Sequence, residues 1–412
     1  MNAANPAHAA TRIPLHPLTF VPEPDGVMVG RADAAAYALL PEDGAALLGR
    51  LADGMPAREA AAWYEATYGE TVDMADFVAT LDELGFLRGE GDTAAAPPRV
   101  RLQALGRAVF SPWAWTCYAL LALVCAFFLA VEPGVRPSAQ HVFFSPSLIV
   151  VQLGLALVQV PLALLHEGFH ALAGRRLGLP TRLGMGRRYF LPVFETSLDG
   201  LLGVERKKRY LPFLAGMLAD AVMVCVFTAL AGADLADGSL SWVGKLALAV
   251  CYVTLIRLAW QFYLCLRTDV YYVLATALGC TNVHEVASAY LRRRFPALAR
   301  IPGVRLARLD ESEWSPRDRA VAPWYSVILV GGVALLLAGA LLVVGPVVLE
   351  FATRVVDGLG HASLSDARFW DSTVTLLLAV VQFAVLPLLA GRGPRTDSPA
   401  PNARNARKEQ SA

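Results

Sequence analysis

The sequence predicts a mainly α-helical, polytopic membrane protein with a small soluble domain at its N-terminus. The chain of 412 residues is 56% hydrophobic and 17% charged, whereas a soluble domain carries about a quarter charged residues. Its mean hydropathy is +0.47. The apolar residues gather in runs after residue 108, each long enough to cross a bilayer core of about 30 Å. With a net charge of +1 and no basic domain, no nucleic-acid partner is expected.

The apolar runs and the charges between them predict the topology. Length and absence of charge predict about six transmembrane helices, in residues 108–131, 145–172, 211–233, 243–266, 323–349 and 372–390. Arginine and lysine are concentrated before the first run, between the second and third, between the fourth and fifth, and after the last. The positive-inside rule therefore predicts a multi-pass protein of the cell membrane, embedded in the lipid bilayer, with both termini in the cytoplasm.

Changes in composition along the chain divide it into four segments. We expect a soluble domain in residues 1–95, a linker in 96–107, a transmembrane domain in 108–391 and a disordered cytoplasmic tail in 392–412. The first twenty residues lack a long apolar core, so no cleaved signal peptide is expected.

The soluble domain is expected to contain one short strand and three helices. Residues 26–30 (GVMVG) have the apolar pattern of a strand. Apolar residues recur at helical spacing in 41–51, 56–67 and 73–84. Asp73 can cap the third helix, and Gly85 can close it in the left-handed conformation.

One apolar run carries a motif typical of zinc sites, His166-Glu167-Gly168-Phe169-His170. Residues four apart share a helix face, so the two histidines can present their imidazoles to one ion. Glu167 lies beside them and can accept a proton without being a ligand. The alternative is a pair of membrane-interface histidines with a glutamate that reaches towards water. That alternative is unfavourable, because each charged group in an apolar run costs several kcal/mol of free energy. Such groups are therefore expected mainly where they have a function.

A catalytic zinc site needs a third protein ligand and one open position. Asp269 follows the fourth apolar run and is expected at the same membrane depth as the histidines. Asp220, inside the third run, is the rival for this role. Asp269 could instead be a membrane-border carboxylate paired with Arg267. The weaker candidates for the third ligand are Glu195, Asp199, His141 and His284.

Three segments carry a resemblance to a known family. HEGFHALAGRRLG (166–178) resembles the HExxHxxxAxxxG segment of the site-2 protease group of intramembrane zinc metalloproteases. TDVYYVLATALGCTN (268–282) is similar to the TDGYYxLxxLLGxxN motif of the peptide zinc metalloprotease branch of that group, with Val270 in place of glycine. AGMLAD (215–220) is similar to its AGPxxN element, with Met217 for proline and Asp220 for asparagine. The resemblance covers roughly residues 145–285.

The resemblance implies a membrane-embedded zinc metalloendopeptidase. In that family, His166, His170 and Asp269 would hold Zn²⁺, and Glu167 would act as general base on the zinc-bound water. The substrate would be a ribosomally made peptide or a membrane-anchored protein, and the role of Asp220 stays open. The alternative is a catalytically silent membrane partner in peptide maturation, export or immunity. A secondary transporter would need paired repeats, which the sequence does not show.

The N-terminal segment carries a second, less specific resemblance. The order of a strand, three short helices and a Gly-Phe-Leu end at residues 26–88 resembles the PqqD-like domains of ribosomal-peptide maturation systems. This implies a winged-helix-like domain that binds a leader peptide as an added strand packed on the third helix. The strand 27–29 would then lie at a sheet edge. The alternative is a structural or regulatory cap.

Overall fold

The computed structural model describes residues 12–89 except 32 and 35, and residues 100–382 except 189–190, 236–237, 301–305, 310, 312–313 and 361–364. The expected tail, 392–412, lies outside these residues. In the described part, the strands are β1 Thr19–Glu23, β2 Gly26–Arg31, β3 Ala36–Leu40, β4 Arg182–Arg188 and β5 Leu191–Ser197. The helices before the metal motif are α1 Glu42–Ala52, α2 Ala57–Tyr68, α3 Met74–Glu83, α4 Gln103–Val109 and α5 Pro112–Val131. The later helices are α6 Leu148–Arg176, α7 Arg206–Asp234, α8 Trp242–Trp260, α9 Asp269–Leu278, α10 Val283–Arg294, α11 Pro316–Gly339, α12 Gly345–Gly360 and α13 Ala367–Val380.

The N-terminal domain is a three-stranded antiparallel sheet packed on α1 to α3. The expectation of a single strand at a sheet edge was wrong, because the strand order is β1-β2-β3 and β2 lies in the centre. Register pairs Val29 of β2 with Phe20 on one side and Ala38 on the other. β3 reads AYALL, and alanine and leucine favour helix over strand. Its strand conformation therefore depends on pairing with β2, a contact that local pattern does not reveal.

The three helices of this domain lie where the sequence predicts them. One face of the sheet packs on α1 and α3 around buried Val29, Leu48 and Phe86. Asp73 caps α3 by accepting hydrogen bonds from the backbone N–H groups of residues 75 and 76. Gly85 follows the helix with φ 69°, the left-handed conformation expected of it.

The described part of the chain contains five helical stretches long and apolar enough to cross a membrane. Four are single helices, α5, α6, α7 and α8. The fifth is a continuous stretch of 45 residues, Pro316–Gly360, in which a π-helical turn joins α11 to α12. The sixth expected span overlaps α13, and its residues 383–390 lie outside the described part. In the most apolar window of α5 only 6% of the residues are buried, and in that of Pro316–Gly360 none are, as expected of helices that face lipid.

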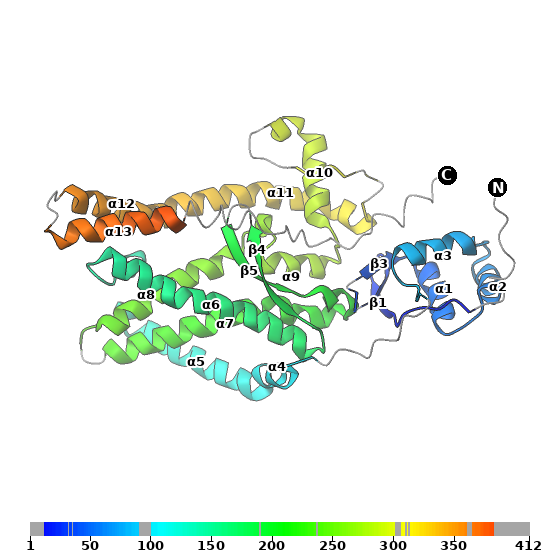
Figure 1. The fold of residues 1–412 in the computed structure, drawn as a ribbon, viewed down its shortest axis with the longest axis horizontal. Coiled ribbons are helices and arrows are strands. Elements are labelled where there is room, and N and C mark those ends of the chain that lie inside the picture. The colour runs from blue at the N-terminus through cyan, green and yellow to red at the C-terminus, as the bar shows by residue number, and fades with distance from the viewer. Residues whose placement is uncertain are drawn as a thin grey trace.

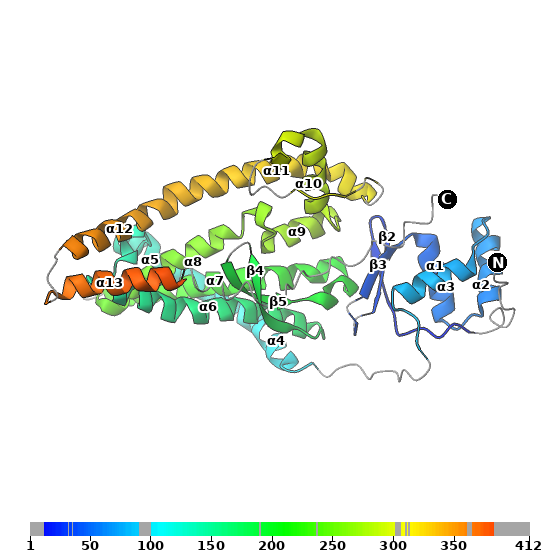
Figure 2. The same cartoon turned by 45° about the horizontal axis from the view of Figure 1, so that its top comes forward.

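The helices form an elongated bundle with the N-terminal domain at one end (Figure 1). α7 packs against α5, α6 and α8, and α9 lies between α7 and α11 in both views (Figure 2). The expected linker ends in α4, which packs on α6. The hairpin β4–β5 lies along α6. The N-terminal domain contacts the first turns of α7 and α11, so the segments predicted to be cytoplasmic meet at one end of the bundle.

Candidate metal centre

His166 and His170 lie one helical turn apart on the face of α6 that meets α7. Both imidazoles are buried, with 6% and 5% of the residue exposed. Their Nε2 atoms are 3.2 Å apart. The spacing of four residues places the rings on one face, and the packing of α7 keeps that face away from lipid. The two nitrogens therefore point at a common position inside the bundle.

Asp269, the first residue of α9, reaches the same position from the other side. After α8 the chain turns back at Arg267, which has φ 53°. The Thr268 hydroxyl donates to the Gln261 carbonyl at 2.6 Å, and the Gln261 amide oxygen accepts from the Asp269 N–H at 3.2 Å. This turn places Asp269 Oδ2 3.3 Å from Nε2 of both His166 and His170.

The three side chains together can hold a metal ion. One ligand atom from each of His166, His170 and Asp269 lies within 4.8 Å of the others. Asp269 Oδ2 is buried, and neither Nε2 atom at 3.3 Å nor any other group in the described part of the chain forms a hydrogen bond with it. A buried carboxylate oxygen without a donor costs free energy unless a cation compensates it. The donor set of two imidazoles and one carboxylate therefore fits a metal ion.

The outer nitrogen of each imidazole has its own acceptor. His170 Nδ1 lies 2.7 Å from the carbonyl oxygen of Pro212, and His166 Nδ1 lies 3.0 Å from Asp220 Oδ2. When Nδ1 donates to these oxygens, Nε2 presents its lone pair to the shared position. Such outer contacts fix both the tautomer and the ring orientation of a metal-binding histidine. α7 therefore orients both rings, although it supplies no atom to the three-residue group.

Asp220, the rival for the third-ligand role, lies behind His166 instead of beside the Nε2 atoms. Its carboxylate is 1% exposed and forms an ion pair with Arg257 of α8, at 2.5 Å from Nη2. Arg257 also donates to Gln159 of α6 at 3.2 Å. A buried carboxylate is costly without such a partner. Asp220 therefore links α6, α7 and α8 around the site and holds the His166 ring.

Gly216 makes room for both imidazoles. A Cβ atom at this position would lie 2.3 Å from His170 Nε2 and 2.4 Å from His166 Nε2. Ala215 and Ala219, on the same part of α7, are fully or almost fully buried. Small residues allow two helices to approach closely. The AGMLAD segment thus brings α7 against the histidines and leaves the space in front of them open.

Glu167 is held by a strand residue that the sequence analysis did not identify. The Thr196 hydroxyl of β5 lies 2.9 Å from both Oε2 and the backbone oxygen of Glu167. This contact places the carboxylate on the side of α6 that faces the hairpin β4–β5, and Glu167 is half-buried there. Its role as a general base stays a prediction.

The other sequence candidates lie elsewhere or outside the described side chains. His141 contacts Ser138 in a short turn before α6. His284 lies on α10, 3.4 Å from the Tyr325 hydroxyl, and burial together with the nearby Arg267 guanidinium lowers its pKa to about 4. Arg267 pairs with Glu285 at 2.8 Å, so the pairing of Asp269 with Arg267 is not what the structure shows. Glu195 is exposed on β5, and the Asp199 side chain is not described.

Three further polar residues at the site could have been found from the sequence by one rule. Gln159, Arg257 and Gln261 all lie inside predicted apolar spans or at their ends. Polar residues in a membrane span usually face the bundle interior and serve a site there. Thr196 carries no such signal, because it belongs to a loop hairpin.

Comparison of the chain with protein-family models, with curated proteins and with solved structures finds no match. Function therefore has to be argued from the site.

Proposed function

We propose that the chain is a membrane-embedded zinc metallopeptidase of the site-2 protease type. The observation that carries the proposal is the convergence of His166, His170 and Asp269 within 4.8 Å, with Glu167 next to the first histidine on the same helix. Two imidazoles and a carboxylate are a ligand set of catalytic zinc sites that keep an open position. The resemblance of the three sequence segments to that protease group supports the same assignment.

In the proposed reaction the chain provides the proton transfer and the orientation of the ligands. A bound Zn²⁺ supplies Lewis acidity towards water and towards the scissile carbonyl. Glu167 takes a proton from the attacking water and later delivers it to the leaving amine. Thr196 fixes the Glu167 carboxylate during both transfers. Asp220 and Pro212 keep the two imidazoles in place, so the site is preorganised before substrate arrives.

The proposed substrate is a ribosomally made peptide or a membrane-anchored protein. The N-terminal domain would then act as a PqqD-like recognition domain. In the structure its sheet edges are β1 and β3, so these are the strands to which an extended leader peptide would pair. We further propose a location in the cell membrane with both termini in the cytoplasm. Reporter fusions after residues 95, 190, 300 and 400 should report the cytoplasm, and fusions near 137, 237 and 360 should report the opposite side.

The alternative function is a silent membrane partner in maturation, export or immunity. Such a protein has no need for an intact set of ligands, an orphaned Asp269 oxygen and a positioned Glu167, so the site favours the enzyme.

The test combines metal content with turnover. Purified protein should contain about one zinc per chain, and Asp269→Ala should lose it. Glu167→Gln should keep the zinc, since no ligand is removed, and should lose cleavage of membrane-anchored reporter peptides in proteoliposomes. Glu195→Gln, a carboxylate change on the neighbouring strand, is the control and should retain both. Near-normal cleavage by Glu167→Gln would exclude the proposed mechanism.

A further inference from the structure

The last carbonyl groups of α9 are held by two arginines from other parts of the chain. The carbonyls at the end of a helix have no partner within it. Arg206, at the start of α7, donates from Nη2 to the carbonyl oxygens of Thr276 and Ala277 at 2.5 and 3.1 Å. Arg317, at the start of α11, donates from Nε to the carbonyl oxygen of Leu278 at 3.0 Å. These two side chains therefore hold the end of α9 together with its own backbone cap, in which the Gly279 N–H donates to the Thr276 carbonyl at 3.1 Å.

Both arginines are in turn held by one hairpin of the N-terminal domain, residues 23–25. Glu23 Oε2 lies 3.7 Å from Arg206 Nε. The backbone N–H of Arg317 donates to Asp25 Oδ2 at 3.1 Å. Between these carboxylates, Pro24 packs against the end of α9. The hairpin thus lies beside the end of α9 through Pro24 and is linked to it by Arg206 and Arg317, which Glu23 and Asp25 contact.

The Glu23 side of the contact is buried, whereas Pro24 and the hydrogen bond of Asp25 to Arg317 are exposed. Glu23 also pairs with Arg209 at 2.6 Å, and 8% and 7% of these two side chains are exposed. Gly279 follows α9 in the left-handed conformation and lies close to Pro24. A Cβ atom at Gly279 would lie only 2.6 Å from Pro24 Cγ. Removing one partner of a buried ion pair is strongly unfavourable. The domain is therefore held in one position against α9.

We propose that the hairpin 23–25 is a positioning element for the metal centre, through which docking of the N-terminal domain sets metal affinity. α9 has ten residues, Asp269–Leu278, so its two ends lie about 15 Å apart on a stiff rod. A change in docking at the C-terminal end moves Asp269 relative to the two histidines on α6. Couplings of this kind change affinity by about 5- to 150-fold. The inference rests on the metal site of the proposed function but not on turnover.

The experiment measures metal binding in the full-length protein, in detergent. Glu23→Ala combined with Asp25→Ala removes both carboxylate contacts and leaves every residue of the metal centre unchanged. Zinc affinity, titrated in competition with a fluorescent chelator, should fall by about tenfold. Hydrogen exchange of the backbone amides in 270–282 should become faster. Glu205→Ala is the matched control, because Glu205 is exposed and its ion pair, with Lys208, involves no residue of the N-terminal domain.

A second variant guards against a general folding defect. Pro24→Gly keeps both carboxylates and both arginines and removes only the packing on α9, so it should shift affinity and exchange in the same direction by a smaller factor. Unchanged zinc affinity and unchanged exchange in the double variant would overturn the proposal and leave the domain a pure recognition module. If the chain binds zinc but cleaves no peptide, the proposed function is refuted, whereas the zinc titration still tests the coupling between the hairpin and the metal centre.

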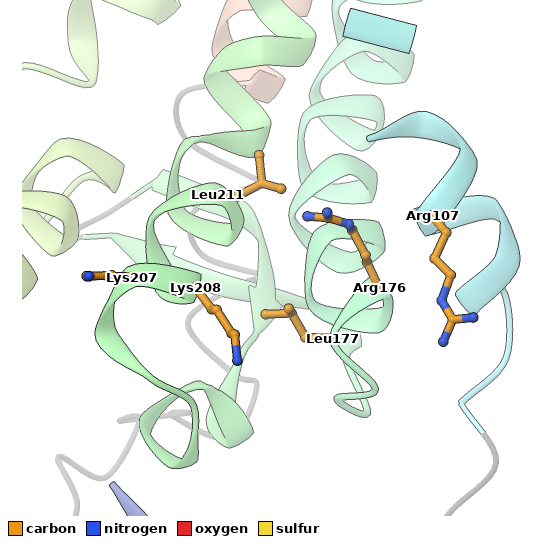
Figure 3. A pocket seen from close by; sticks show the side chains of 6 residues that line it. All are labelled: Arg107, Arg176, Leu177, Lys207, Lys208 and Leu211. Carbon is orange, nitrogen blue, oxygen red and sulfur yellow. The ribbon is translucent and has the colours of Figure 1, made fainter. Parts of the chain in front are cut away.

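A separate observation concerns a cavity of about 510 Å³ on the surface of the bundle. It lies where α4, the end of α6 and the start of α7 meet (Figure 3). Its lining consists of four cations and two leucines, Arg107, Arg176, Lys207, Lys208, Leu177 and Leu211. The Arg176 side chain points from α6 towards Leu211 of α7 (Figure 3). The Lys207 side chain extends away from Leu211 and the cavity (Figure 3).

The charges of this cavity are poorly compensated within the chain. Lys208 pairs with Glu205 at 2.9 Å. In the described part of the chain, no carboxylate forms an ion pair with Arg107 or Arg176. Both leucines are half-buried and form an apolar wall beside the arginines. The cavity lies at the ends of two predicted spans, which is the depth of lipid headgroups.

We infer that the cavity binds the phosphate group of an anionic phospholipid. Two guanidinium groups can each bind phosphate oxygens through paired N–H donors. The leucine wall suits the glycerol and upper acyl chain, which free phosphate lacks. Basic pockets between membrane helices on the cytoplasmic side are suited to such headgroups.

The test compares two pairs of arginines on the cytoplasmic side. Protein in mixed phosphatidylglycerol and phosphatidylcholine nanodiscs should retain phosphatidylglycerol in native mass spectrometry. Arg107→Gln with Arg176→Gln should reduce retention about tenfold, whereas Arg292→Gln with Arg294→Gln on α10 should not. Equal loss in both variants, or equal retention of phosphatidylcholine, would overturn the inference. Displacement by inorganic phosphate would assign the site to free phosphate instead of lipid.

Discussion

Substituting Gly216 with alanine should weaken metal binding strongly, although Gly216 is not a ligand. The added Cβ would lie 2.3 and 2.4 Å from the Nε2 atoms of His170 and His166. Ordinary van der Waals contacts begin near 3.4 Å, so each ring would have to retreat by about 1 Å. Neither ring can swing freely, because Pro212 and Asp220 hold the opposite nitrogens.

The size of the expected effect follows from the tolerance of metal coordination. Ligand distances must be kept to about 0.2 Å. Disturbing only the outer contacts of a ligand costs about 10- to 100-fold in metal affinity. A shift of both ligands should therefore weaken zinc binding by at least about 100-fold. Competition with a fluorescent chelator measures the affinity, and the visible absorption of the Co²⁺ form reports the coordination geometry.

Gly168→Ala is the matched control for this prediction. Gly168 lies between the two histidines on α6, and a Cβ there would have nothing within 4 Å. Alanine is the better helix former, so this variant should fold at least as well and bind zinc normally. The reasoning is refuted if Gly216→Ala binds zinc as tightly as the unmodified chain while the thermal unfolding of the two proteins coincides.

Three further predictions concern the contacts around the site, the cytoplasmic helices and the N-terminal domain. Asp220→Asn should weaken zinc binding about tenfold in the same titration, because the charge that orients His166 is lost while an acceptor remains; wild-type affinity would contradict the orienting role. The pKa of His284 is lowered from 6.5 to about 4 in the folded chain. Since the unfolded chain binds that proton first, stability should fall as the pH drops from 6.5 towards 4, by at most about 3 kcal/mol. Thermal unfolding of His284→Gln should show a shallower dependence over this window, and an equal dependence would count against the assignment. Asp73→Ala should destabilise the N-terminal domain by about 1 kcal/mol through loss of the helix cap, seen as a lower denaturation midpoint of its unfolding transition; Asp76→Ala in the first turn of the same helix is the comparison, and an equal effect would contradict the cap.

Local pattern was sufficient for most of the helices. The helical intervals of residues 41–84 and the apolar runs predict elements whose hydrogen bonds close within the segment itself. For the same reason the sequence places His166, Glu167 and His170 on adjoining positions of one helix. The strands were different. β1 and β3 exist because each pairs with β2, and a pairing partner leaves no periodic signal in segments as short as TFVPE and AYALL.

The third residue of the metal group marks the limit of the sequence by itself. Asp220 lies inside one apolar run and Asp269 follows another, and spacing alone leaves both as candidates for the third ligand. In the structure the two carboxylates contact different nitrogens of the imidazoles. The orientation of α7 about its axis directs Asp220 towards His166 Nδ1, whereas the turn after α8 brings Asp269 to Nε2 of both rings. The orientation of α7 is set by its contacts with other helices, where Gly216 packs on the histidines of α6 and Asp220 pairs with Arg257 of α8. The sequence therefore determined which chemistry is present, and only the packing of the helices decided which atoms meet.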